Sequence, residues 1–297
     1  MPVTNGADIM AANTYGFIGL GNMGGPMCAN LIAAGLSVQV FDAADTAALA
    51  PKGSAATDNV GALAAAVDTI FLSLPDGKIV HAVCAEIANA ELRRVTTVVD
   101  FSTTGPEAAG QALAILADVG ITFVDAPVSG GKAGAVAGTL TVIVSGPDAA
   151  VGDLAVPFRA VGGNIFHVGP NPGQAQAVKL LNNFLSATAM AATSEAVLFG
   201  QKHGVDMSTI LDVVNVSTGR NTATMDKFPN RVVPETFDAG FAMELMTKDV
   251  ALYLEQVGVA GTPDAVGSTM SALWNAAHDK MPGSDFTKIY RYIAGEK

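Results

Sequence analysis

A lysine and an asparagine, Lys179 and Asn183, are the pair of side chains in this chain that best suits proton transfer. They lie in the stretch GQAQAVKLLNN, which reads as a helix, so both would project from one helical face, one turn apart. If that face is buried between two domains, desolvation lowers the pKa of the lysine and makes it a useful proton donor or acceptor near neutral pH. Asn183 would then hold the ammonium group or a substrate oxygen in place. The same spacing also fits a surface lysine whose aliphatic stem lies along the protein.

A glycine-rich segment near the N-terminus has the residue types that bind a phosphate. Gly19, Gly21 and Gly24 match the pattern G-x-G-x-x-G between an apolar run, residues 15–20, and a helix-like stretch. In a strand-turn-helix of this kind the glycines allow a tight turn, approach of the backbone to a pyrophosphate and close packing of strand and helix. The pattern therefore predicts a dinucleotide site. The alternative is a glycine turn that serves packing alone.

An acidic residue follows this segment at the distance that a dinucleotide site requires. The apolar run SVQVF ends at Asp42, which lies 18 residues after Gly24. A carboxylate there accepts hydrogen bonds from the adenosine ribose hydroxyls and repels a 2′-phosphate. We therefore expect NAD as the cofactor, with NADP the alternative. If the glycine turn serves packing alone, Asp42 is a solvated surface residue.

The segment DAPVSGGKAGAVAGTL could bind a carboxylate. Its first residues read as a strand that delivers Ser129, Gly130 and Gly131 to the carboxyl edge of a sheet, where open α/β sheets bind ligands. The glycines expose backbone N–H groups and the serine adds a hydroxyl, so together they would form a pocket of hydrogen-bond donors. The alternative is a simple turn.

The elements that must position these residues fall into two parts. From residue 15 to 169, short β-rich runs alternate with Ala-rich helical runs, which favours an open, doubly wound and mostly parallel sheet. Residues 175–203 then read as one long apolar helix, followed by helical stretches at 207–216, 248–257 and 266–280. We expect an N-terminal tail (1–14), a nucleotide-binding α/β domain (15–173) and an all-helical domain (174–297), joined by the long helix.

Composition narrows the choice of partners. The formal net charge of −11 disfavours nucleic acid and anionic lipid, and no apolar run reaches the ~18 residues that cross a membrane. The two cysteines and the absence of a signal-like N-terminus favour free thiols and a cytoplasmic location. The four histidines show no metal-ligand spacing, so we expect no metal. A small-molecule substrate is the expected partner.

Four segments in order resemble the signature blocks of the β-hydroxyacid dehydrogenase family, which contains 3-hydroxyisobutyrate dehydrogenases and tartronate semialdehyde reductases. The segments are FIGLGNMGGPM, DAPVSGGKAGA, the helix with Lys179 and Asn183, and LMTKD (245–249). The resemblance implies a Rossmann-like domain, an all-helical domain that forms homodimers or homotetramers, and a nicotinamide cofactor. One departure is Ala175, which replaces the last glycine of the family's run before the lysine.

The resemblance also implies roles for individual residues. Lys179 would be the catalytic lysine and Asn183 its positioning partner, while Ser129, Gly130 and Gly131 would hold the substrate carboxylate. The cofactor would contact Gly19, Leu20, Gly21, Asn22, Met23, Gly24, Leu74, Pro75, Thr103 and Lys248. Phe241, seven positions before Lys248, would line the pocket or belong to the core.

The predicted function is hydride transfer between a nicotinamide cofactor and a small 3-hydroxy acid, similar to 3-hydroxyisobutyrate, with Lys179 as general acid and base. An NADPH-dependent aldehyde or imine reductase is one alternative. The lysine argues against imines because the related imine reductases tend to lack it, and Asp42 argues against NADPH. A non-catalytic NAD-binding scaffold on the same fold is the other alternative.

Overall fold

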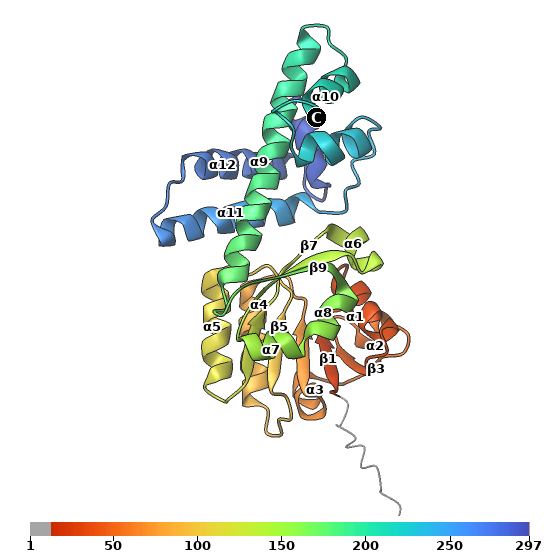
Figure 1. Cartoon of the computed structure of the whole chain (residues 1–297), viewed down its shortest axis with the longest axis vertical. Helices are drawn as coiled ribbons and strands as arrows, with labels where there is room; N and C mark the ends of the chain where they lie inside the picture. The colour runs from red at the N-terminus through yellow and green to blue at the C-terminus, as the bar shows by residue number, and fades with distance from the viewer. Residues whose placement is uncertain (1–12, 297) are drawn as a thin grey trace, which may run out of the picture.

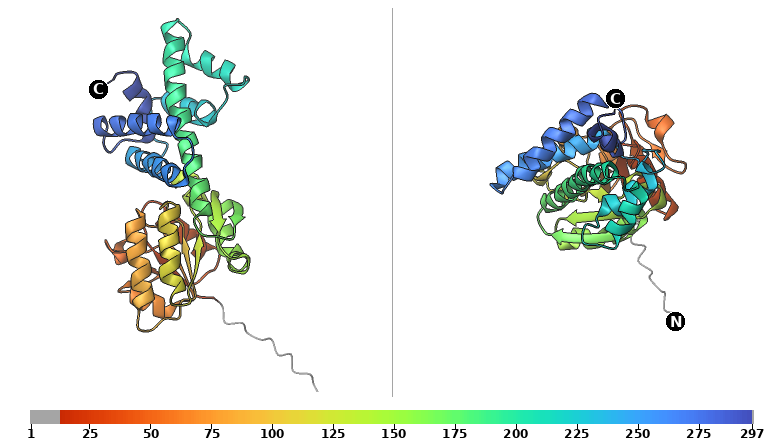
Figure 2. Two further views of the ribbon diagram at one scale, coloured as in Figure 1. Left: turned by 90° about the vertical axis from the view of Figure 1, so that its left-hand side faces the viewer. Right: turned by 90° about the horizontal axis from the view of Figure 1, so that it is seen from above.

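The computed structural model describes residues 13–296, which form a sheet domain and a helical domain connected by one long helix (Figures 1 and 2). This helix, α9 (Gln174–Lys202), starts against the sheet domain and runs the length of the helical domain. The expected N-terminal tail lies almost entirely outside the described residues. The fold is α/β with a mostly parallel sheet and a helical C-terminal domain, as predicted.

The sheet contains nine strands, in the order β3-β2-β1-β4-β5-β6-β8-β7, and β9 pairs with β8. The strands are β1 (Tyr15–Ile18), β2 (Val38–Phe41), β3 (Ala55–Ala56), β4 (Thr69–Leu72), β5 (Thr97–Asp100), β6 (Thr122–Asp125), β7 (Val128–Ser129), β8 (Leu140–Ser145) and β9 (Gly162–Gly169). All pairs from β3 to β6 are parallel. β8 runs antiparallel to both β6 and β7, because the chain turns back within the sheet instead of crossing over by a long helix. The carboxyl ends of the six strands β1 to β6 therefore share one edge.

Helices cover both faces of the sheet. They are α1 (Gly24–Ala33), α2 (Thr46–Leu49), α3 (Val60–Ala66), α4 (Gly77–Asn89), α5 (Pro106–Ala117), α6 (Gly131–Ala137), α7 (Asp148–Asp153) and α8 (Ala155–Val161). One buried cluster joins α1 and α8 to the sheet through aromatic rings including Phe17, Phe71 and Phe101. A second cluster packs α3, α4 and α5 on the opposite face. Cys28 and Cys84 are free and buried, one in each cluster.

The helical domain packs around the middle and end of α9. Its elements are α10 (Met207–Asn215), the π-helix η1 (Ala223–Val232), α11 (Met243–Ala260), α12 (Ala265–Lys280), the short 3-10 helix η2 (Phe286–Lys288) and α13 (Ile289–Ile293). Trp274, Phe228 and Met246 belong to its core. The predicted stretch 248–257 is only the middle of α11. The π-helix was not predicted; it contains Pro229, which has no N–H to donate to an α-helical ladder.

Within residues 13–296, no helix combines the length and the hydropathy needed to span a membrane.

Candidate active site

The glycine segment forms the strand-turn-helix between β1 and α1. Gly19 has a φ of +92°, and a Cβ on it would lie 2.2 Å from the carbonyl oxygen of Ser73. A Cβ on Gly24 would lie 1.9 Å from the carbonyl oxygen of Gly19. A Cβ on Gly21, in contrast, would meet no atom of residues 13–296 within 4 Å. Packing therefore requires the first and third glycines, while the second faces open space just before α1.

Asp42 follows β2 and is tied to the glycine turn. Its Oδ2 accepts a hydrogen bond from the Leu20 N–H at 2.7 Å, and its Oδ1 accepts one from the Ala44 N–H at 2.8 Å. Each carboxylate oxygen can accept a further hydrogen bond, so this partly exposed group remains able to bind ribose hydroxyls. The carboxylate thus also holds the turn in place, a role that its spacing did not reveal.

The loops after β1, β4 and β5 are connected along the sheet edge. The loop after β4 packs against Gly19, and its Leu74 N–H donates to the Ser102 hydroxyl at 2.8 Å. The next residue, Thr103, accepts a hydrogen bond through its carbonyl oxygen from the Lys248 Nζ at 2.8 Å. Lys248 belongs to α11, so the helical domain closes over this edge of the nucleotide-binding domain. The predicted cofactor residues Leu74, Thr103 and Lys248 therefore lie in one continuous set of contacts.

Lys179 and Asn183 are both buried at the domain junction, on one face of α9, with exposed fractions of 7% and 6%. The Lys179 Nζ donates to the Asn183 Oδ1 at 3.1 Å. The Asn183 Nδ2 in turn donates to the Asp249 Oδ2 at 2.6 Å, and Asp249 is 2% exposed. The hydrogen bond to Asp249 holds the amide so that the oxygen of Asn183 faces the lysine. The surface-lysine alternative does not fit this burial.

The electrostatic environment suits Lys179 for proton transfer near neutral pH. Burial lowers the pKa of Lys179 to about 8; the charge of Asp249 raises the pKa and the charge of Lys248 lowers it further. Lys248 lies 3.2 Å from the Asp249 Oδ1 and is less buried than Lys179. Asp249 therefore pairs directly with Lys248 and reaches Lys179 through its charge and through Asn183, while burial favours the neutral form of Lys179.

Sequence reasoning missed Asp249, although LMTKD contains it. A signal was present, because Asp249 follows Met246 by three positions and precedes Tyr253 by four, and so lies on the inward face of α11. A carboxylate at such a position is buried only if it has partners.

Ser129, Gly130 and Gly131 form the end of β7 and the start of α6, and they meet a different part of the helical domain. A Cβ on Gly131 would lie 3.8 Å from the carbonyl oxygen of Ala239. A Cβ on Gly240 would lie 3.8 Å from the Cβ of Lys132. The segment predicted to bind a carboxylate therefore borders the loop between η1 and α11 and remains partly exposed.

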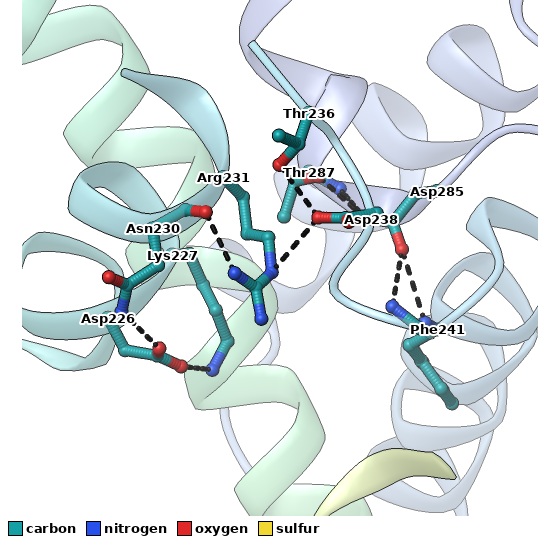
Figure 3. A network of polar contacts seen from close by, with 10 residues as sticks. Asp226, Lys227, Asn230, Arg231, Thr236, Asp238, Phe241, Asp285 and Thr287 are labelled. Atoms are coloured by element: carbon teal, nitrogen blue, oxygen red, sulfur yellow. Dashed lines mark hydrogen bonds and ion pairs between the residues drawn. The ribbon is translucent and has the colours of Figure 1, made fainter. Parts of the chain in front are cut away.

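Phe241 lies in the same loop and is half-buried. Its N–H and that of Gly240 donate to the Asp285 carboxylate at 3.2 and 2.9 Å, and its ring packs edge-on against Phe286. Figure 3 shows the ring directed away from this polar network. Asp285 also caps η2 through the Thr287 N–H, so one carboxylate positions both the loop and the following turn.

Two cations of the π-helix region are already paired with acids. The Arg231 Nε lies 3.2 Å from the Asp238 Oδ1, which also accepts a hydrogen bond from the Thr236 hydroxyl (Figure 3). Lys227 is paired with Asp226. No cluster of three or more His, Cys, Asp or Glu residues in the described chain could hold a metal ion.

The site combines a glycine turn that fits a dinucleotide with an acid after the second strand and a buried lysine where the helical domain meets the sheet edge. These features define a nicotinamide-dependent dehydrogenase. Comparison with known proteins agrees. Residues 14–169 match the NAD-binding domain of 6-phosphogluconate dehydrogenase, and residues 173–293 match the NAD-binding domain of NADP-dependent 3-hydroxyisobutyrate dehydrogenase.

Individual relatives cover nearly the whole chain. A 2-(hydroxymethyl)glutarate dehydrogenase of Eubacterium barkeri is 38% identical over 87% of this chain and 85% of its own length. A 3-hydroxyisobutyrate dehydrogenase of Pseudomonas aeruginosa is 35% identical over 94% of this chain and 98% of its own. The structure of a Mycobacterium tuberculosis 3-hydroxyisobutyrate dehydrogenase with L-serine is 31% identical, covers 95% of this chain and 99% of its own, and superposes with a TM-score of 0.88. The chain belongs to the β-hydroxyacid dehydrogenase family. It is a dehydrogenase, and its cofactor is NAD or NADP.

Proposed function

We propose that the chain interconverts a small 3-hydroxy acid and the corresponding semialdehyde, with a substrate similar to 3-hydroxyisobutyrate. The relatives' named compounds 2-(hydroxymethyl)glutarate and 3-hydroxyisobutyrate, and the L-serine of the mycobacterial structure, share one chemical unit. Each carries a hydroxymethyl group on the carbon that bears a carboxylate. This common unit, with a variable third substituent, is the substrate class that we infer.

The residues present fit a nicotinamide dinucleotide. The open space in front of Gly21 would accommodate the pyrophosphate, and Asp42 would favour the ribose hydroxyls of NAD over a 2′-phosphate. Lys248, bound to the Thr103 carbonyl oxygen at the sheet edge, would contact the cofactor. When bound, the cofactor supplies the hydride acceptor for oxidation and the hydride donor for reduction.

The chain's own residues bind the acid and move the proton. The N–H groups of Gly130 and Gly131, with the Ser129 hydroxyl, hold the carboxylate. Neutral Lys179 accepts the hydroxyl proton as the alcohol is oxidised, and the ammonium form returns it in the reduction. Asn183 keeps the lysine directed at the substrate oxygen. Proton transfer of this kind contributes about 10²–10⁴-fold to the rate.

The observation that carries this proposal is the buried set Lys179–Asn183–Asp249. The test is Lys179→Ala, with Lys202→Ala, an exposed lysine at the other end of α9, as the matched control. We expect Lys179→Ala to lose at least about 10²-fold in kcat while NAD affinity, measured by nucleotide fluorescence, stays within about twofold. Turnover above a tenth of the parent rate would exclude this role for Lys179.

A substrate panel tests the chemistry separately. Small 3-hydroxy acids that differ only in the third substituent are offered with NAD or NADP, alongside aldehydes and imines, and the reduced nicotinamide is followed by absorbance. We expect turnover of hydroxymethyl acids with NAD. Turnover confined to imines with NADPH, or NAD binding without any turnover, would contradict the proposal in favour of a reductase or a scaffold.

We also infer a homodimer or homotetramer. Leu181, Leu185 and Phe199 lie on one face of α9 with exposed fractions of 43%, 60% and 68%. Exposed large apolar side chains on a domain-connecting helix are typical of a subunit interface.

A further inference from the structure

The N-terminus of α9 is capped by side chains of the other domain. The first helical residue follows Gly173, which has no side chain of its own to cap with. The Asp125 Oδ2, at the end of β6, accepts hydrogen bonds from the Gly173 N–H at 3.0 Å and the Gln176 N–H at 3.2 Å. The Ser145 hydroxyl, at the end of β8, accepts one from the Ala175 N–H and donates to the same Asp125 oxygen, both at 3.1 Å. Two strand ends therefore provide the cap that helix N-termini need.

Gln176 completes this connection from the helix side. Its Oε1 accepts hydrogen bonds from the Thr104 N–H at 2.9 Å and the Gly105 N–H at 3.1 Å. Its Nε2 donates to the Asp125 Oδ1 at 2.7 Å and to the Ser102 carbonyl oxygen at 2.9 Å. All four hydrogen-bonding positions of the amide are used, and the side chain is completely buried.

These contacts connect Gln176 with the segments that support Lys179 and Lys248. Lys179 follows it by three positions, about one helical turn, so the amide fixes the height and rotation of the helix where the lysine projects. The loop that Gln176 holds also contains Thr103, whose carbonyl oxygen accepts the hydrogen bond from Lys248. One buried amide thus connects the support of Lys179 with that of Lys248.

We propose that Gln176, held by Asp125, is a positioning residue that sets Lys179 and Lys248 in place relative to the cofactor edge of the sheet. This inference rests on the proposed role of Lys179. The residue would act through the two lysines and touch neither substrate nor cofactor. A displacement of about 1 Å at a reacting group costs on the order of 10²-fold in rate. Loss of the hydrogen bonds between Gln176 and Asp125, which we call the clamp, should therefore affect turnover before it affects folding.

The charges around the clamp decide which substitution is informative. Asp100, on the neighbouring strand β5, is paired in register with Asp125, and the charge of Lys248 on α11 acts on Asp100. Burial raises the pKa of Asp125 to about 6, although four hydrogen bonds, two of them from Gln176, oppose this. Asp125 is therefore ionised at pH 8, and a second carboxylate at position 176 would face it directly.

The first variant is Gln176→Glu, which keeps the size of the side chain and replaces the donating nitrogen by an oxygen. We expect kcat at pH 8 to fall by about 10²-fold. The ratio of variant to parent kcat should rise as the pH falls from 8 to 6, because a protonated glutamic acid can again donate to Asp125. The matched control is Gln174→Glu, the same change on the exposed side of the same turn, with kcat within about twofold of the parent.

The second variant, Asp125→Asn with Gln176→Glu, reverses the direction of the hydrogen bond between the two side chains. The asparagine amide would donate to the new carboxylate, and its oxygen would still accept from the helix N-terminus. We expect the double variant to be at least about tenfold more active than Gln176→Glu alone, a coupling that independent sites do not show. Thermal unfolding and NAD binding report separately on folding.

Three outcomes would overturn the proposal: Gln176→Glu within threefold of the parent at pH 8, a variant-to-parent ratio of kcat that does not change with pH, or a double variant no more active than Gln176→Glu alone. An insoluble single variant counts as inactive in the last comparison.

If Lys179→Ala is inactive while Gln176→Glu has normal activity, only the positioning role of Gln176 fails. If Lys179→Ala retains activity, the proposed function fails first.

Discussion

Burial distinguishes Lys179 from Lys248, the other lysine at the junction of the two domains. Lys179 is buried at the junction of the two domains, where its Nζ donates a hydrogen bond to Asn183. The neighbouring Asp249 limits how far burial lowers the pKa, since it favours the charged form. The balance leaves the pKa of Lys179 at about 8, where a small change in pH converts a proton donor into a proton acceptor.

The pH dependence should therefore have opposite signs in the two directions. Oxidation needs neutral Lys179, so kcat/KM for the hydroxy acid should rise as the pH increases through about 8 and then level off. Reduction needs the ammonium form, so kcat/KM for the semialdehyde should fall over the same range. Steady-state rates at a fixed cofactor concentration in each direction measure both profiles. A change of the same sign in both directions would show that another group controls the rate.

At the scale of the element, the turn between β1 and α1 separates two roles of glycine. Gly24 lies against the carbonyl oxygen of Gly19, so its lack of a side chain allows the strand and helix to meet. Gly21 faces open space instead, so the fold does not require its lack of a side chain, and we propose that a bound ligand does.

Alanine substitutions distinguish these two roles. Gly24→Ala forces the backbone apart and should lower the free energy of unfolding by about 2 kcal/mol or more. Gly21→Ala meets no protein atom, so we expect its melting temperature to stay within roughly 2 °C of the parent while its Kd for NAD rises about tenfold. Calorimetry and a nucleotide titration measure both. Equal NAD affinity in Gly21→Ala and the parent would contradict the placement of the pyrophosphate.

At the scale of the whole molecule, α9 connects the two domains and carries three functions along its length. Its first turn is hydrogen-bonded to the sheet domain, its second turn carries the proposed catalytic residue Lys179, and its outer face presents Leu181, Leu185 and Phe199. Figure 2 shows the same helix from two further directions, with the helices of the C-terminal domain gathered around it. A partner that covers its outer face would also hold the lysine-bearing helix in place.

The oligomer is tested by placing charges on that face. We expect the parent to elute as a dimer or tetramer in light-scattering chromatography, and Leu185→Glu with Phe199→Glu to elute as a monomer, because a buried unpaired charge is strongly unfavourable. Val156→Glu, an equally exposed apolar residue on α8, is the control and should leave the mass unchanged. A monomeric parent would refute the predicted interface.

Local patterns predicted much of this molecule. The alternation of strand and helix led to the parallel sheet, the glycine spacing led to the turn at Gly19, and the helical spacing placed Lys179 and Asn183 on one face. All three depend on residues within one or two turns of each other. The antiparallel return of β8 and the π-helix were missed because they depend on which segments the rest of the chain packs beside them.

The amino-acid sequence alone determined the fold class, the glycine turn and the position of Lys179 and Asn183 on one face of a helix, because each follows from periodicity or from spacing along the chain. Only the tertiary structure decided which groups surround that lysine. Asp249 reaches Asn183 across 66 positions, and Asp125 reaches the first turn of α9 across 51. Distances of that kind exist only after the two domains have packed together, so burial, the orientation of the amide and the pKa of the lysine are properties of the packed molecule.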